Sequence, residues 1–138
     1  MIHEHDIRVY YEDTDAGGIV YNANYLKFFE RARTELMREL GYQSSTSMAE
    51  LGWMFVVTKV SVTYKRPAKL DDILTVKSHI EDLQPKRLTF VQNVWREGKI
   101  ITEGLVELAC MNMEGRGQEI TKDIVDMISP YLNETMTP

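Results

Sequence analysis

The chain begins with an alternation of apolar and polar side chains. Ile7, Val9 and Tyr11 are separated by polar neighbours, a period of two that predicts a short strand ending at the acidic stretch 12–15. An Ala-Gly-Gly sequence follows at residues 16–18, and glycine pairs of this kind favour a tight turn. We therefore expect a strand and then a turn near the start of the chain.

The spacing of apolar residues becomes helical after this turn. Apolar residues lie three or four positions apart, which places them on one helical face; they are Tyr25, Phe29, Ala32, Leu36 and Leu40. Gly41 provides a stop signal, because glycine readily adopts the left-handed conformation that ends helices. We expect Asn22 or Asn24 to cap the start, since its side-chain oxygen can accept from free backbone N–H groups.

Four long β patterns fill most of the second half of the chain. They are rich in β-formers and extend over residues 55–66, 71–82, 87–97 and 99–113. Pro67 ends the first pattern because proline has no N–H to donate to a ladder, and Gly98 indicates a hairpin between the last two. Strands in series without intervening helices pair largely antiparallel. Short helices are expected up to Leu51 and around residues 124–131.

This order of elements is α+β. The helix and the sheet bury each other if the sheet curves around the helix. A chain of 138 residues fits one domain and can form a core without disulfides or metals. We expect its ends to fray at about residues 1–4 and 133–138.

Composition narrows the partners and the compartment. The formal net charge of −5 disfavours nucleic-acid binding, although a local cluster of cations can still hold a small anion. The single Cys110 excludes an internal disulfide, and no run of about 18 apolar residues is present to span a membrane. Residues 1–10 carry no secretory signal pattern, so we expect a cytoplasmic protein.

The densest chemical signal is the stretch YEDTDAGGIVYNANY at residues 11–25. It places Asp13 and Asp15 at the mouth of a glycine turn, just before the long helix. An Asp side chain is normally ionised at neutral pH, so Asp15 can act as a base or a nucleophile without activation. Glycines let backbone N–H groups approach a ligand, and a helix N-terminus stabilises a carbonyl oxygen that gains charge. The alternative is that both aspartates only cap N–H groups of the turn.

This stretch, continued through FFERARTE at residues 28–35, resembles the signature of the 4-hydroxybenzoyl-CoA thioesterase family of hotdog-fold enzymes. The most similar branch is that of the bacterial acyl-CoA thioesterases associated with the Tol-Pal system. The resemblance extends to FVV at 55–57, RPA at 66–68, LDD at 70–72 and FVQ at 90–92. It implies a hotdog fold, in which a five- to six-stranded antiparallel sheet wraps a long central helix. It also implies hydrolysis of acyl-CoA to a free acid and CoA, without cofactor or metal, by a homodimer or homotetramer.

The resemblance gives roles to individual residues. Asp15 matches the catalytic carboxylate of the family, whereas Asp13 lies outside the essential role. The oxyanion donor is a backbone N–H near Asn22, and Gly18 helps to orient the carbonyl. Many members of this branch have His at position 22. Because an amide does not titrate, Asn22 cannot replace a His in proton transfer, so we expect this difference to bear on rate and substrate range more than on reaction class.

Further residues are expected to hold the substrate. The expected CoA contacts are Lys86, Arg87 and Thr89, with Lys65 and Arg66 assisting, because phosphates require cations or free N–H groups. The expected pocket lining is Tyr21 and Tyr25, together with Val57, Thr58 and Lys59 of a partner chain. Cations at strand ends also commonly protect sheet edges, which is the alternative role of Lys86 and Arg87.

Other interpretations of the acidic residues are weaker. Glu30 lies on the helix, where another hotdog branch has its catalytic carboxylate, but Lys27 and Arg33 are three residues away and favour an ion pair. Asp13 and Asp15 also resemble a metal-binding motif, yet no parallel βαβ repeat accompanies them.

Two function classes stay open at this point. The first is an acyl-CoA thioesterase, and the second is a catalytically weak hotdog acyl-CoA-binding or scaffold protein, for which Asn22 is the only hint. Hydration or dehydration of acyl thioesters is disfavoured, because it normally needs a His near the acid.

Overall fold

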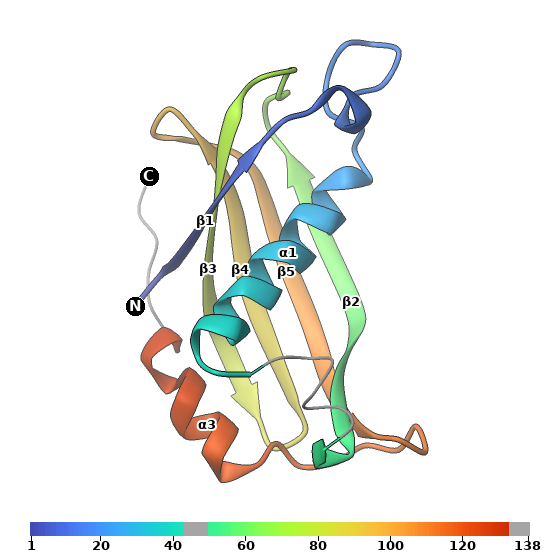
Figure 1. Ribbon diagram of the computed structural model, residues 1–138, viewed down its shortest axis with the longest axis vertical. Coiled ribbons are helices and arrows are strands. Elements are labelled where there is room, and N and C mark those ends of the chain that lie inside the picture. Colours follow the sequence, from blue (N-terminus) through green and yellow to red (C-terminus); the bar gives the residue numbers. More distant parts are fainter. Residues whose placement is uncertain (43–49, 133–138) are drawn as a thin grey trace.

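A five-stranded antiparallel sheet forms most of the molecule (Figure 1). The computed structural model describes residues 1–42 and 50–132. The strands are β1 (His3–Arg8), β2 (Trp53–Tyr64), β3 (Ile73–Gln84), β4 (Arg87–Arg96) and β5 (Lys99–Asn112). Their order in the sheet is β1-β3-β4-β5-β2, so β1 and β2 are the two edges. The expected antiparallel pairing of the four long β patterns is confirmed.

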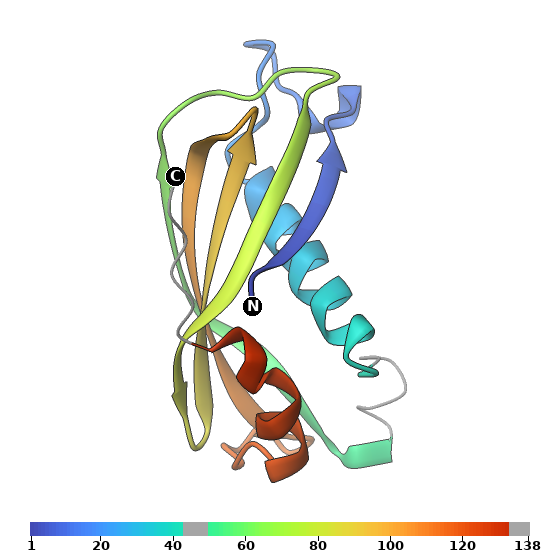
Figure 2. The ribbon, with the colours of Figure 1, turned by 90° about the vertical axis from the view of Figure 1, so that its left-hand side faces the viewer.

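The long helix α1 (Asn24–Glu39) packs on one face of this sheet, which curves around it (Figure 2). Its buried side chains are Tyr25, Phe28, Phe29, Ala32, Leu36 and Met37. Burying each large apolar side chain contributes about 1.5–3 kcal/mol, so this face fixes the helix on the sheet. Gly41 follows the helix with a φ of 91°, as the expected stop signal requires. The α+β class and the hotdog architecture expected from the sequence are confirmed.

The helix approaches the sheet closely at Gly104 of β5. A Cβ atom at this position would lie 2.6 Å from Cζ of Phe29 and 2.8 Å from the carbonyl oxygen of Gln92. Gln92 is buried here, and its side-chain amide donates to the Phe29 carbonyl over 3.0 Å and to the Ser78 hydroxyl over 3.0 Å. Arg33 donates to the Gln92 amide oxygen over 2.9 Å. A polar network therefore ties α1 to the sheet beneath it.

The hairpin between β4 and β5 has the expected turn. Glu97 and Gly98 have φ values of 51° and 78°, which are the two left-handed residues of a tight antiparallel hairpin. The expected closing helix is also present, as α3 (Lys122–Ile128) followed by a single 3-10 turn, η2 (Ser129–Tyr131).

The first strand differs from the expectation. It begins at His3 and ends at Arg8, and residues Tyr11–Asp13 form the 3-10 turn η1 instead of the end of a strand. His3 is only 4% exposed, pairs in register with Ser78 and lies 3.1 Å from a carboxylate oxygen of Glu39. The expectation that residues 1–4 fray is therefore wrong for His3 and Glu4. The expected frayed tail at 133–138 and most of the short helix expected up to Leu51 lie outside the described residues.

Candidate active site

The stretch around Asp15 folds into a tight hairpin turn. The Gly18 N–H donates to the Asp15 carbonyl over 3.0 Å, and the Asp15 N–H donates to the Ile19 carbonyl over 2.9 Å. Gly18 has a φ of 79°, a conformation that costs glycine nothing and strains other residues. Thr14 and Val20 form an antiparallel bridge that closes the turn.

The Asp15 side chain stays accessible in this turn. Its Oδ1 accepts a hydrogen bond from the Gly17 N–H over 2.8 Å. This bond fixes the side-chain orientation, as the turn interpretation predicted, while the side chain remains solvent-exposed. Asp15 and Gly18 line one shallow hollow, together with Tyr11, Thr14, Ala16 and Leu70. The structure therefore presents a carboxylate of fixed orientation that a ligand can reach.

Asp13 is occupied by structural contacts. Its carboxylate accepts from the Tyr10 N–H over 2.9 Å, which caps η1. Its backbone carbonyl accepts from the Tyr21 N–H and from the Asn24 side-chain amide, both over 2.9 Å. Asp13 thus joins the segment that carries Asp15 to the start of α1.

The start of α1 has no side-chain cap. The N-cap residue is Ala23, and no side chain accepts from the first N–H groups of the helix. The expectation that Asn22 or Asn24 caps the helix is wrong, because Ala23 is the N-cap residue and no side-chain cap hydrogen bond forms. The Asn24 side-chain N–H donates instead to the Asp13 carbonyl. Neither Asn22 nor Ala23 donates its backbone N–H to another described residue. These N–H groups are available for a ligand oxygen, and the helix end adds partial positive charge.

A second hollow of about 360 Å³ lies beside this helix start. It is lined by Ile19, Val20, Asn22, Tyr25, Tyr64, Lys65, Arg66 and Pro67. Tyr25 is buried against Phe28, and desolvation raises the pKa of its phenol. Lys65 forms an ion pair with Glu103. The side chain of Tyr21, expected in the pocket lining, is about half exposed.

A loop between β2 and β3 braces the turn that carries Asp15. The Val20 N–H donates to the Ala68 carbonyl over 2.9 Å. Arg96, at the end of β4, donates to the Pro67 carbonyl over 2.7 Å and pairs with Asp72 at 3.1 Å. The catalytic candidate is therefore anchored to the end of β4 at which Arg96 lies.

The main expected CoA contacts, Lys86, Arg87 and Thr89, lie at the opposite end of β4, whereas Lys65 and Arg66 lie at the hollow beside Asn22. Lys86 precedes β4, Arg87 is its first residue and Thr89 its third, whereas Arg96 is its last. At about 3.3 Å per residue, Arg87 and Arg96 are separated by about 30 Å. Figures 1 and 2 show the turn between β3 and β4 at the end of the molecule away from the stretch before α1. One protomer thus does not bring Lys86, Arg87 and Thr89 together with Asp15.

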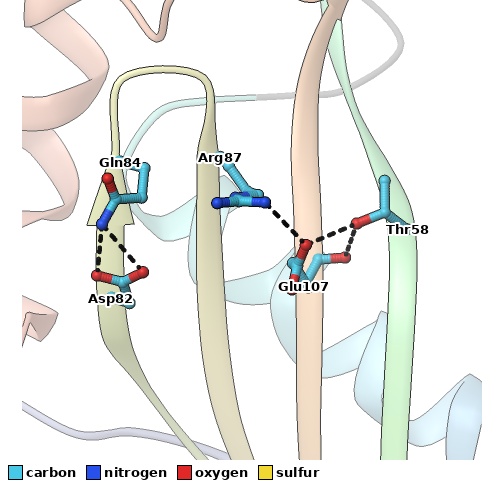
Figure 3. Close-up of polar contacts among 5 residues, drawn as sticks. All are labelled: Thr58, Asp82, Gln84, Arg87 and Glu107. Atoms are coloured by element: carbon cyan, nitrogen blue, oxygen red, sulfur yellow. Dashed lines mark hydrogen bonds and ion pairs between the residues drawn. The ribbon is translucent and has the colours of Figure 1, made fainter.

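Arg87 is paired with a carboxylate in this region (Figure 3). Glu107 of β5 lies 3.6 Å from Arg87, and its carbonyl accepts from the Thr58 hydroxyl over 3.2 Å. Thr58 occupies an irregularity in the register of β2 against β5, between Val57 and Lys59. The Lys59 side chain lies with Thr89 and Glu107 around a small hollow.

A largely apolar cleft lies between α1 and the sheet. This cleft of about 430 Å³ runs from Leu26, on the first turn of α1, to Met37 on its last turns, and Val57 of β2 contributes to its wall. At 1.5 Å per residue its helical side is about 16 Å long. Glu30 and Arg33 also line it. Burial lowers the pKa of the Arg33 guanidinium, and the charge of Glu30 counteracts this. Among the described residues Glu30 forms no salt bridge, so the expected ion pair with Lys27 or Arg33 is absent. Arg33 donates instead to Gln92.

The sequence did not single out Tyr64 or Glu107, and it gave Asn24 a capping role. In the structure Asn24 and Tyr64 donate to backbone carbonyls near the start of α1, and Glu107 pairs with Arg87 at the other end of the sheet. The sequence carried a local signal only for the helix start. Alanine is a poor N-cap, so Ala23 just before the helix indicates backbone N–H groups without a side-chain cap.

The described residues hold neither a candidate metal site nor a helix that could span a membrane. No group of three or more His, Cys, Asp or Glu is placed to hold a metal ion in residues 1–42 and 50–132. No helix in the same ranges is long and apolar enough to cross a membrane.

Comparison with known proteins gives one consistent family. Residues 9–129 match the Thioesterase-like superfamily. The chain is 42% identical over 107 residues to the acyl-CoA thioesterase YbgC of Haemophilus influenzae, covering 78% of this chain and 79% of the relative. It is 40% identical over 121 residues to the acyl-CoA thioester hydrolase YbgC of Escherichia coli O6:H1, covering 86% and 90%. A probable thioesterase from Bartonella henselae superposes with a TM-score of 0.84 at 34% identity, covering 88% of this chain and all of that one. The chain belongs to the thioesterase-like superfamily.

Proposed function

We propose that this protein hydrolyses acyl-CoA thioesters, with Asp15 as the reacting carboxylate. The observation that carries the proposal is a pair of hydrogen bonds: the Asp13 backbone carbonyl accepts from both the Tyr21 N–H and the Asn24 side-chain amide. These bonds hold an exposed carboxylate and the uncapped start of α1 in one rigid unit. The relatives of about 40% identity named as acyl-CoA thioesterases support the substrate class.

In this mechanism the thioester oxygen lies at the helix start, near the N–H groups of Asn22 and Ala23. These dipoles stabilise the negative charge that develops on the oxygen during attack. Two routes use the same carboxylate. Asp15 attacks the carbonyl carbon, expels the CoA thiolate and forms a mixed anhydride that water then cleaves, or Asp15 takes a proton from the water that attacks. Single turnover in ¹⁸O-labelled water separates them, because only the anhydride route places label in Asp15.

The acyl chain occupies the cleft between α1 and the sheet in this proposal. Its first helical residue is Leu26, two positions after the helix start, so a chain attached at the reacting carbon can enter along the helix. The wall is largely apolar, with Phe29, Phe55 and Val57 among its residues. Burial of methylene groups at about 0.8 kcal/mol each would favour aliphatic substrates that fill it.

Subunit assembly completes the site in this proposal. Strand β2 is an edge whose outward backbone groups lack a partner strand among the described residues, and Val57, Val60 and Tyr64 on it are exposed. An edge of this kind is suited to pairing with a second copy. The separation of about 30 Å between Arg87 and Arg96 along β4 supports the same arrangement. Arg87 of one protomer is too far from its own Asp15, so it binds the CoA of a substrate whose thioester lies at the Asp15 of another subunit.

The assembly assigns residues of one subunit to the site of another. Lys86, Arg87 and Thr89 of one subunit hold the CoA phosphates for the Asp15 of another, and Thr58 and Lys59 of the partner line the pocket. The assembly is a homodimer or a homotetramer. We place it in the cytoplasm, because the only thiol, that of Cys110, is buried and unpaired.

The experiment that tests the function is a thiol-release assay across acyl-CoA substrates of increasing chain length. The proposal expects turnover that rises as the chain fills the cleft. Binding of acyl-CoA without thiol release would instead support the acyl-CoA-binding or scaffold alternative. Sedimentation tests the assembly, and a monomer at all concentrations would contradict it.

A further inference from the structure

Tyr64 connects the end of strand β2 to the start of helix α1. Its hydroxyl donates to the backbone carbonyl of Asn22 over 2.8 Å. Tyr64 is the last residue of β2, and Asn22 lies just before the N-cap residue Ala23. The bond therefore links the sheet edge to the segment that has free backbone N–H groups.

The bond has a consequence for the peptide that joins Asn22 to Ala23. A peptide unit is planar and trans, so its carbonyl oxygen and its N–H point in opposite directions. Holding the Asn22 oxygen toward Tyr64 turns the Ala23 N–H away from Tyr64. Donation to the oxygen also polarises the same peptide and strengthens its N–H as a donor, by about 10–30% in condensed-phase estimates.

The Tyr64 side chain is itself held in place. Its ring packs edge-on against Tyr25, with ring centroids 5.5 Å apart and an interplanar angle of 65°, and Tyr25 is buried on the first turn of α1. Desolvation raises the pKa of the Tyr64 phenol, so the hydroxyl stays protonated and keeps its role as donor. Its bond to Asn22 is the one hydrogen bond to the Asn22 carbonyl among the described residues.

We propose that Tyr64 is a positioning residue for the reaction: it orients the Asn22–Ala23 peptide so that the Ala23 N–H receives the thioester oxygen. This inference rests on the proposed function. It adds that the N–H that donates to the thioester oxygen is that of Ala23, and that Tyr64 of strand β2 sets its direction.

The first test is Tyr64→Phe, which removes the hydroxyl and keeps the ring contact with Tyr25. We expect kcat to fall about 10-fold and KM to stay unchanged, because the bond acts on the transition state and not on substrate binding. The melting temperature should fall only slightly, as the loss of one partly exposed hydrogen bond predicts. Tyr131→Phe, which removes a phenol hydroxyl from η2, is the matched control and should leave kcat unchanged. A kcat within twofold of wild type, or a rise in KM alone, would overturn the inference.

The second test replaces Tyr64 by a fluorinated tyrosine of lower pKa. We expect kcat to fall as pH rises through the lowered phenol pKa, because a phenolate cannot donate to the Asn22 carbonyl. Wild-type enzyme should show no such fall in that range. Identical pH profiles for the two enzymes would contradict the inference, since a structural role of the ring alone does not titrate.

The third test needs no turnover. The amide ¹⁵N and ¹H shifts of Ala23 report the bond to the preceding carbonyl, so Tyr64→Phe should move both in the NMR spectrum, whereas Tyr131→Phe should not. Unmoved Ala23 signals would refute the inference whether or not the enzyme is active. An inactive wild type, or an active Asp15→Asn variant, would refute the proposed function instead.

Discussion

The side-chain amide of Asn24 donates to the backbone carbonyl of Asp13 over 2.9 Å. Asn24 is the first residue of α1, and Asp13 lies two residues before Asp15. The same carbonyl oxygen accepts from the Tyr21 N–H. The helix start and the turn that carries Asp15 therefore move as one body, which fixes the distance between the carboxylate and the free N–H groups.

Replacing Asn24 by Leu, which is similar in size and cannot donate, tests this coupling. We expect kcat to fall about 10-fold with little change in KM, and stability to fall by about 1 kcal/mol, the typical net value of one hydrogen bond. Steady-state kinetics and denaturant unfolding provide the two measurements. Gln84→Leu, which removes an exposed amide that donates to Asp82, is the control. An Asn24→Leu enzyme with wild-type kcat would show that the contact does not matter for catalysis.

Neutralising Lys86 and Arg87 tests the CoA contacts. Each lost charge-assisted contact costs about 1.5–3 kcal/mol, so we expect KM to rise at least 10-fold in the Lys86→Gln/Arg87→Gln double variant, with a smaller effect on kcat. Arg66→Gln is the comparison, because Arg66 lies beside Asn22 within the same protomer. If KM rises only in Arg66→Gln, the nucleotide is held at that end and the partner is not required for it.

The carboxylate of Glu107 competes for Arg87 at 3.6 Å. If Arg87 binds a CoA phosphate, the exposed ion pair must be broken or shared, at a cost of about 0.2–1 kcal/mol. Glu107→Gln should therefore lower the Kd for CoA by up to about fivefold, as measured by calorimetry. Weaker CoA binding by this variant would mean that the phosphates lie elsewhere.

The sheet approaches α1 closely at Gly104. In Gly104→Ala the added Cβ would meet Phe29 at 2.6 Å and the Gln92 carbonyl at 2.8 Å, and the backbone oxygen cannot yield cheaply. We expect a loss of about 1–3 kcal/mol in the free energy of unfolding, the usual cost of overpacking. Gly117→Ala is the matched control, because the nearest atom to its Cβ is a Lys86 side-chain carbon at 3.6 Å. Equal stability of the two variants would contradict the close packing of Phe29.

Local patterns predicted the elements that local chemistry determines. The helix from Asn24 to Glu39 follows from its apolar spacing, and the hairpin at Gly98 follows from its turn residues. Contacts between distant segments leave no such pattern. His3 is buried where it pairs with Ser78 of β3 and packs near Glu39 and Tyr131. Asn24 donates to a carbonyl 11 residues earlier, while Ala23 is the N-cap residue. The bond from Tyr64 to Asn22 joins residues 42 positions apart.

The candidate site shows the same division. The composition of the segment around Asp15 and its resemblance to the family signature identified it as the candidate site, and the structure has the expected glycine turn there. Arg87 and Asp15 lie far apart in one protomer because of the order and length of the strands. The sequence around either residue does not predict this distance.

The account depends most on Asp15, and the most direct measurement is kcat for thiol release by Asp15→Asn. This change keeps the size of the side chain and its acceptor for the Gly17 N–H but removes the charge. We predict a fall in kcat of at least about 100-fold, the scale of losing a general base, with acyl-CoA binding retained. Asp13→Asn should have a much milder effect, because its carboxylate only caps η1. An Asp15→Asn enzyme with near wild-type kcat would contradict the assignment and the mechanism built on it.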